Sequence, residues 1–302
     1  MNMAVTNRCN LKCLMCDIWK EKSKRDLPVG MVKKVLDAGC LDDHLDITLT
    51  GGEPFLYQGL WPLTDAILLR DSRWLKGLST NGTRTKEALL YLHDFSKRLP
   101  CDFSLHISMD GIHCHDKHRG PSMNKILDTI HAVKSAHPSV GIKIKFTITS
   151  VNYADVIPTF RFCRENGLDF RVKLAEYAKN YTNRMGRRSF CFDDAARKSI
   201  IHDLLEVGRE KRRLRDKNAA FIADTVRFLQ GTFRREVCAV PFQRVFLMPN
   251  GDVFTCIHFS KIGNLRNNSL DKIWGSSIAE KHRHSVKQRG CSGCVSYHGV
   301  AG

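Results

Sequence analysis

Short apolar runs rich in β-branched residues alternate with stretches of helical periodicity over the first 175 residues. The short runs predict six strands: Asn2–Thr6, Asp46–Thr50, Gly77–Thr80, Asp102–Met109, Gly141–Thr149 and Asp169–Leu174. The periodicity between them predicts five helices: Val29–Ala38, Leu60–Leu69, Lys86–Phe95, Lys125–Ala136 and Val156–Asn166. Each interval has the length of a βαβ crossover, which favours parallel strands. We therefore predict an α/β fold, a partial (β/α)6 TIM-like barrel whose active face lies at the carboxyl ends of the strands.

The alternation stops after the sixth strand. Two longer helical patterns follow, at Asp193–Arg215 and Ala219–Leu229. The apolar runs Phe242–Met248 and Asp252–Ile257 then flank an Asn-Gly pair, a strong hairpin signal, and a helix is predicted over Ser269–Val286. These patterns predict three parts: a partial barrel over 1–175, a helical bridging segment over 176–237, and a small C-terminal domain of a β-hairpin and a helix over 238–302.

The composition is that of a globular protein, because 42% of the 302 residues are hydrophobic, enough for one large core and a small one. No apolar run reaches the roughly 18 to 20 residues that span a bilayer. The start of the sequence has neither the basic nor the apolar region of a signal peptide. We therefore expect a cytoplasmic protein with no membrane partner.

The net charge of +17 is unevenly distributed, and residues 161–237 alone carry 19 basic and 11 acidic residues. Positive charge favours anionic partners such as phosphorylated molecules, nucleotides, nucleic acid or acidic peptides. A single basic run such as Arg209–Arg215 is also consistent with a solvated helix end. No nucleic-acid-binding motif accompanies the charge. A nucleic-acid partner is therefore disfavoured, and an anionic substrate is expected.

Seven of the twelve cysteines fall into two sets, one at residues 9–16 and the other from residue 238 onward. In a long chain without a secretion signal, such sets indicate metal ligands or catalytic thiols. The other five are scattered, as is typical of small buried hydrophobic residues: Cys40, Cys101, Cys114, Cys163 and Cys191.

The first set consists of Cys9, Cys13 and Cys16, directly after the first predicted strand. Three thiolates at spacings of four and three can hold one [4Fe–4S] cluster from a single loop. Since four cysteines fill all four irons, three leave one iron open to another ligand. A zinc loop is the alternative, but zinc sites prefer paired Cys-x-x-Cys units and tetrahedral closure.

This loop resembles the radical S-adenosylmethionine (SAM) superfamily signature C-x-x-x-C-x-Φ-C, with Met15 where an aromatic that packs on adenine is usual. The resemblance implies that SAM chelates the open iron through its amino and carboxylate groups. It also implies that one electron, from a donor such as flavodoxin or ferredoxin, cleaves SAM to methionine and a 5′-deoxyadenosyl radical. That radical abstracts a hydrogen atom from the substrate.

Further motifs at the ends of the predicted strands extend the resemblance. Gly51-Gly52-Glu53-Pro54 looks like the family's GGE(P) motif, which receives the SAM amino group. Ser79–Gly82, Ser108–Gly111 and His115–Gly120 are similar to segments that contact SAM, with a serine at the ribose and an arginine at the methionine carboxylate. The SAM contacts implied in this way are Met15, Gly51, Gly52, Glu53, Pro54, Thr80, Asn81, Ser108, Asp110, Arg119 and Thr149. Without the resemblance, these residue types would indicate only turns and helix caps.

The second set is Cys238, Cys256 and Cys291-Ser292-Gly293-Cys294, with the predicted hairpin between the first two. Four such cysteines also suit a structural zinc site. Their order, however, resembles the twitch domain, a shortened form of the SPASM domain. The resemblance implies one auxiliary [4Fe–4S] cluster with all four irons ligated, because no cysteine follows Cys294.

A closed auxiliary cluster can accept an electron from a substrate radical, so the expected activity is that of an oxidoreductase that dehydrogenates a small-molecule or peptide substrate. One alternative is a radical SAM peptide-modifying maturase, or an epimerase in which Cys114 or Cys191 returns a hydrogen atom. An alternative of another class is a basic nucleic-acid-associated protein with a structural metal site.

Overall fold

The computed structural model describes residues 1–41, 45–176, 192–232 and 238–289. Their nine strands form one sheet of order β6-β5-β4-β3-β2-β1-β7-β8-β9. The first six strands are β1 (Asn2–Thr6), β2 (Ile47–Gly51), β3 (Leu75–Thr80), β4 (Ser104–Ser108), β5 (Gly141–Ile148) and β6 (Asp169–Leu174). Neighbours among them pair in parallel. The predicted partial barrel of six parallel strands is confirmed.

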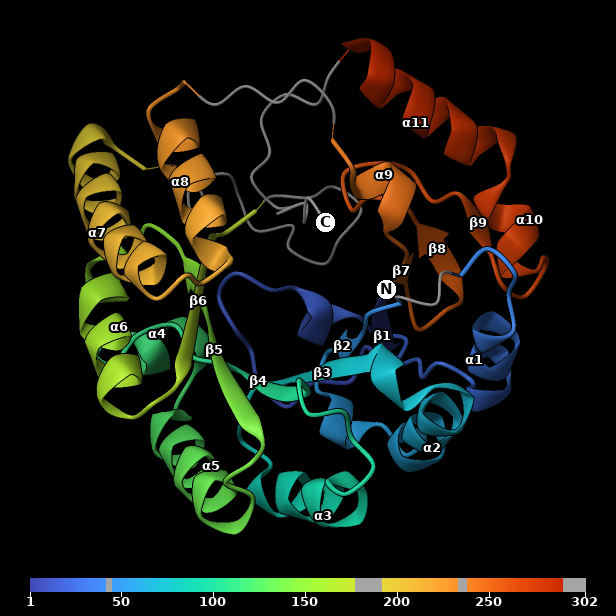
Figure 1. Ribbon diagram of the computed structural model, residues 1–302, viewed down its shortest axis with the longest axis horizontal. Coiled ribbons are helices and arrows are strands. Elements are labelled where there is room, and N and C mark those ends of the chain that lie inside the picture. Colours follow the sequence, from blue (N-terminus) through green and yellow to red (C-terminus); the bar gives the residue numbers. More distant parts are fainter. Residues whose placement is uncertain (42–44, 177–191, 233–237, 290–302) are drawn as a thin grey trace.

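Helices connect these strands and surround the outside of the curved sheet (Figure 1). They are α1 (Val29–Leu36), α2 (Leu60–Arg70), α3 (Thr85–Phe95), α4 (His115–Arg119), α5 (Met123–Ala136) and α6 (Val156–Glu165). The five predicted helices correspond to α1, α2, α3, α5 and α6. The sequence pattern does not predict α4, because its five residues are too few to show a helical period.

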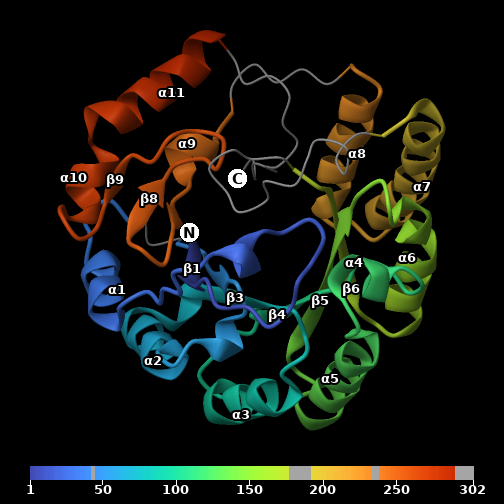
Figure 2. The ribbon, with the colours of Figure 1, turned by 180° about the vertical axis from the view of Figure 1, so that it is seen from behind.

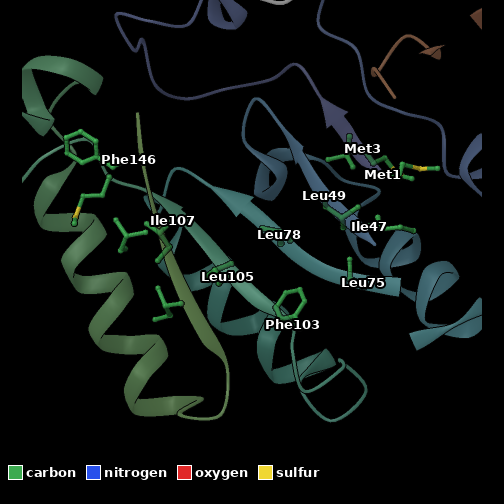
Figure 3. Packing of buried hydrophobic residues seen from close by; sticks show 14 of the residues in the cluster. Met1, Met3, Ile47, Leu49, Leu75, Leu78, Phe103, Leu105, Ile107 and Phe146 are labelled. Atoms are coloured by element: carbon green, nitrogen blue, oxygen red, sulfur yellow. The ribbon is translucent and has the colours of Figure 1, made fainter. Parts of the chain in front are cut away.

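One row of apolar side chains crosses the sheet in register. Met3 pairs with Leu49, Leu49 with Leu78, and Leu78 with Leu105, and all four side chains are fully buried. Figure 3 shows these residues on neighbouring strands in the apolar cluster that the strands form with the helices. This continuous row fixes the register of the barrel, since a slip by one residue would reverse every side chain.

The opposite face of the sheet is polar because side chains alternate along each strand. On β5, the buried apolar residues Ile142, Ile144, Phe146 and Ile148 alternate with Lys143, Lys145 and Thr147. On β6, Phe170, Val172 and Leu174 alternate in the same way with Asp169, Arg171 and Lys173. The polar side chains therefore face the lumen of the barrel.

The C-terminal hairpin continues the barrel sheet. β7 (Phe246–Leu247) pairs in parallel with β1, and the antiparallel strands β8 (Asp252–Phe254) and β9 (Gly263–Asn264) follow. Figures 1 and 2 show these strands beside β1, at the end of the sheet away from β6. The barrel and the hairpin thus share one continuous sheet, and the sequence pattern does not predict this continuity.

The prediction of one helix over Ser269–Val286 was wrong, because the structure has α10 (Leu270–Trp274) and α11 (Ser277–Arg289). The first helix ends at Gly275, and the Ser276 hydroxyl accepts a hydrogen bond from the Ala279 N–H, starting the second. A short helix, α9 (Val240–Gln243), precedes the hairpin.

Two helices, α7 (Asp194–Arg213) and α8 (Asn218–Leu229), lie at the edge of the sheet that β6 forms, where α8 contacts β6. Lys211, which belongs to the basic run Arg209–Arg215, is buried and donates to Asp169 at 2.9 Å and to Asp216 at 2.6 Å. Lys211 therefore takes part in an internal ion network and is not a solvated surface charge. Among the described residues, no helix combines the length and the apolar character that crossing a bilayer requires.

Candidate active site

The cysteine loop leaves the carboxyl end of β1 and is held by the loop after β2. The Gly52 N–H donates to the Thr6 carbonyl and the Glu53 N–H to the Arg8 carbonyl, both at 2.7 Å. This approach requires the two glycines. Gly51 has a φ of +143°, and a Cβ on Gly52 would lie 2.1 Å from the Arg8 carbonyl oxygen.

A second anchor joins the cysteine loop to the loop after β3. The Asn81 amide donates to Asn10 Oδ1 at 2.8 Å, and the Asn10 amide donates to the Thr83 hydroxyl at 2.8 Å. The Leu14 N–H donates to the carbonyl of His118 on α4 at 2.9 Å, which is a third anchor. Three separate loops therefore position the cysteines.

The three thiols of this loop fit a cluster better than a single ion. Cys13 is buried, and burial, with added effects of Cys16 and Cys9, raises its pKa to about 11. Burial likewise raises the pKa of Cys9, and the neighbouring Cys16 adds to this shift. Among the described residues, no three His, Cys, Asp or Glu side chains converge on the position of one metal ion. Three thiols of one loop that influence one another electrostatically suit a [4Fe–4S] cluster, which distributes its ligands over several irons.

Glu53 is fully buried beside this loop. Its Oε1 accepts from the Thr80 hydroxyl at 2.8 Å and from the Phe55 N–H at 3.2 Å, and its Oε2 accepts from the Asn81 N–H at 2.7 Å. Burial raises the pKa of Glu53 to about 7. No ion pair of Glu53 occurs within the described part of the chain, so the site suits a ligand that carries an ammonium group.

Asp110, at the carboxyl end of β4, is also fully buried and holds Arg119. Its Oδ2 accepts from Arg119 Nε at 2.5 Å and pairs with His118 Nδ1 at 2.8 Å, while Oδ1 accepts from the Thr147 N–H at 2.8 Å. Despite its burial, Arg119 and His118 hold the pKa of Asp110 well below its usual range. Asp110 therefore acts on any ligand through Arg119, whose Nη1 lies 3.8 Å from Cys13 Sγ.

The hydroxyl of Thr149, buried at the end of β5, is 3.0 Å from His118 Nε2 and donates to Asn152 Oδ1 at 3.0 Å. The Asn152 amide donates to the carbonyls of Asp110 and Thr147, both at 3.0 Å. Thr149 and Asn152 thus brace the loops around Asp110. Sequence reasoning missed the role of His118, although its place one residue before Arg119 in the motif was a usable signal.

The remaining predicted SAM contacts surround the same face. Met15 is buried in the cysteine loop, Pro54 begins a 3-10 helix ending at Leu56, and Ser108 ends β4, where it pairs with Lys145 of β5. The structure therefore brings the predicted cofactor residues together at the carboxyl ends of β1 to β5.

Two of the four predicted auxiliary ligands lie in the described chain. Cys238 is buried and packs with Val240 and Val286, and Cys256 is half-buried after β8. Burial raises the pKa of Cys256, with a smaller contribution from Cys238, so the two thiols are neighbours. Cys291 and Cys294 lie outside the described residues, as does Cys191.

A cavity of about 440 Å³ connects the barrel lumen to this pair of thiols. Lumen residues of β1 to β3, β5 and β6 form one side, and Cys238, Cys256 and residues near β7 form the other. The sequence reasoning also missed its basic residues Lys145 and Lys173, although the strict alternation in Gly141–Ile148 could have indicated a polar lumen.

Cys114, a predicted hydrogen donor, does not line this cavity. It lies at the start of α4, where its N–H donates to Asp155 Oδ2 at 2.6 Å. Burial and the Asp155 carboxylate raise the pKa of its thiol.

Comparison with known proteins agrees with this geometry. The profile of the radical SAM superfamily matches residues 3–174, more than half of the chain. The chain belongs to the radical SAM superfamily. The profile of the SPASM iron–sulfur cluster-binding domain matches residues 238–295. The protein is therefore a radical SAM enzyme with a SPASM domain, and its cofactors are SAM and two [4Fe–4S] clusters.

Among curated proteins, the chain is 22% identical to the antilisterial bacteriocin subtilosin biosynthesis protein AlbA of Bacillus subtilis, covering 92% of this chain and 59% of AlbA. It is 23% identical to GTP 3′,8-cyclase of Aliarcobacter butzleri, covering 88% of this chain and 82% of that enzyme. The chain thus spans less than two thirds of AlbA.

Two solved structures have the same fold over 95% of this chain at 17% identity. The structure of anSMEcpe with bound AdoMet and the Cp18Cys peptide has a TM-score of 0.69, and 82% of that chain is covered. Streptococcus suis SuiB bound to its precursor peptide SuiA has a TM-score of 0.67, and 66% of that chain is covered.

Proposed function

We propose that this radical SAM enzyme dehydrogenates a substrate held in the cavity between the barrel lumen and the auxiliary cysteines. The observation that carries this proposal is that lumen residues and both Cys238 and Cys256 line the same space of about 440 Å³. A substrate there lies within the barrel that holds the SAM site and also beside the auxiliary site. That volume suits a side chain or a small molecule.

When bound, SAM and its cluster supply the 5′-deoxyadenosyl radical that removes one hydrogen atom from a substrate C–H bond. Cys238 and Cys256 would help to hold the auxiliary cluster, which would supply an acceptor for one electron of the substrate radical, while a proton of the substrate would pass to solvent. The net change would be the loss of two hydrogen atoms, that is two protons and two electrons, from the substrate. One electron from an external donor would cleave SAM, and one electron would leave the substrate for the auxiliary cluster, so the electrons balance over a turnover.

The chain's own residues position these events. Cys9, Cys13 and Cys16 hold the SAM cluster, Glu53 receives the SAM ammonium, and Arg119, oriented by Asp110, receives its carboxylate. Ser108 and Met15 are positioned for the ribose and adenine, and Gly51, Gly52, Pro54, Thr80, Asn81 and Thr149 shape the surrounding loops.

A peptide side chain is the substrate that we favour. The peptides bound in the structures of anSMEcpe and SuiB support this choice, as does the role of AlbA in bacteriocin biosynthesis. A small anionic molecule is the alternative that the GTP cyclases support.

The test uses anaerobically reconstituted protein with SAM, reductant and candidate peptides in D₂O. The proposal predicts a product two mass units lighter, with one 5′-deoxyadenosine per product. The double variant Cys238→Ala/Cys256→Ala should still cleave SAM but form no product, while the exposed control Cys101→Ala should behave as wild type. A product of unchanged composition carrying one solvent deuterium would instead establish an epimerase.

A further inference from the structure

The cavity wall formed by β5 and β6 carries three positively charged side chains. Lys145 pairs in register with Arg171, and Thr147 with Lys173, so the three cations occupy adjacent lumen positions. All three line the cavity, as does Arg244, and Glu176 is the one acidic residue among the described lining residues.

The three strand cations differ in their partners. Arg171 donates to Asp169 at 2.7 Å and to Asp216 at 3.1 Å, so its charge is matched within the protein. Lys145 and Lys173 have no hydrogen bond or ion pair within the described residues. The lumen therefore holds two ammonium groups whose donors are available to a ligand.

Burial, followed by the nearby Lys173, Lys143 and Arg171, lowers the pKa of Lys145 to about 8. Lys173 is exposed, so it is the charged form of Lys145 that this environment disfavours, and an anion beside Lys145 would stabilise that form. Asn218, another lining residue, supports the same conclusion. Its Nδ2 is buried without a hydrogen-bond acceptor in the part of the chain that the structure describes.

We propose that Lys145 and Lys173 bind an oxyanion of the substrate, a carboxylate or a phosphate, on the barrel wall of the cavity. Lysine ammonium groups bind such oxyanions through charge-assisted hydrogen bonds. This inference rests on the proposed function, because it assigns the substrate to this cavity. It adds the chemical class of the group that orients the substrate between the two cluster sites.

The experiment measures binding of two probes, inorganic phosphate and succinate, to the SAM-loaded holoenzyme by calorimetry at low ionic strength. For whichever probe the wild type binds, the double variant Lys145→Met/Lys173→Met should raise the dissociation constant by about tenfold or more. Lys198→Met is the matched control, because Lys198 is an exposed lysine of α7 outside the cavity. Its probe affinity should equal that of the wild type.

The two probes distinguish the sources of the anion, since binding of phosphate alone indicates a phosphorylated substrate and binding of succinate alone a carboxylate. Wild-type protein that binds neither probe would overturn the inference, as would an equal loss in Lys198→Met. A loss of SAM affinity in the double variant would also overturn it, by assigning the two lysines to the cofactor. Failure of the proposed oxidation is a separate result, because SAM cleavage and product mass are measured independently of probe affinity.

Discussion

Arg119 joins the buried carboxylate of Asp110 to the thiol of Cys13. Its Nε donates to Asp110 at 2.5 Å, and its Nη1 lies 3.8 Å from the sulfur. A fixed cation at this point can neutralise part of the charge of a thiolate-bound cluster and bind a carboxylate beside it. The orientation of Arg119 depends on Asp110, which itself has no exposed surface.

The first prediction concerns Asp110→Asn. The amide can still accept from the Thr147 N–H, but the buried guanidinium loses its counter-ion, and breaking such a pair costs roughly 3–5 kcal/mol. SAM affinity should fall about tenfold or more while both clusters keep their spectra. Calorimetric titration with SAM and a thermal melt measure the two effects.

The control for this variant is Asp65→Asn, which breaks the exposed ion pair with Arg98 and should cost at most about 1 kcal/mol. If Asp110→Asn binds SAM as tightly as the wild type, Arg119 does not contact the cofactor.

The second prediction compares two glycines. A Cβ at Gly52 would meet the Arg8 carbonyl at 2.1 Å, so Gly52→Ala must displace the start of the cysteine loop. Gly30→Ala, in the first turn of α1, has no atom within 4 Å of the new methyl group and should leave stability unchanged or slightly higher. Iron content after reconstitution should fall in the first variant alone. Equal iron in both would show that the loop tolerates the displacement.

The third prediction separates the two clusters. Replacing Cys9, Cys13 and Cys16 together with Ala should remove about half of the bound iron and abolish reductive SAM cleavage, because four irons belong to each site. The variant Cys238→Ala/Cys256→Ala should lose a similar amount of iron yet still form 5′-deoxyadenosine. Survival of SAM cleavage in the triple variant would refute the assignment of the first site.

The barrel was predictable from the sequence because its strands and helices have strong local periods. The cysteine loop and the Gly51–Gly52 turn were predictable from their spacing. The pairing of β7 with β1 was not, since each partner contributes two residues from distant parts of the chain. The bracing of Asp110 by His118 and Asn152 likewise depends on tertiary contacts that no local pattern contains.

The fourth prediction concerns Lys145, whose pKa falls from its ordinary 10.5 to about 8 in the folded protein. Between these values the unfolded chain binds more protons at Lys145 than the folded one, so the contribution of Lys145 to stability rises with pH across this window. Below pH 8 its destabilising effect is complete and amounts to at most about 3 kcal/mol. Lys145→Met should therefore stabilise the holoenzyme at pH 7 and lose this advantage toward pH 10.5.

The measurement is the difference in unfolding free energy between Lys145→Met and wild type from pH 7 to pH 10.5, with Lys198→Met as the exposed control. Saturating phosphate or succinate, whichever binds, should shrink the difference at pH 7, because an anion beside Lys145 stabilises its charged form. A difference that is constant with pH would mean that Lys145 titrates as an ordinary lysine. A difference that varies with pH but ignores the anion would place the oxyanion away from this side chain.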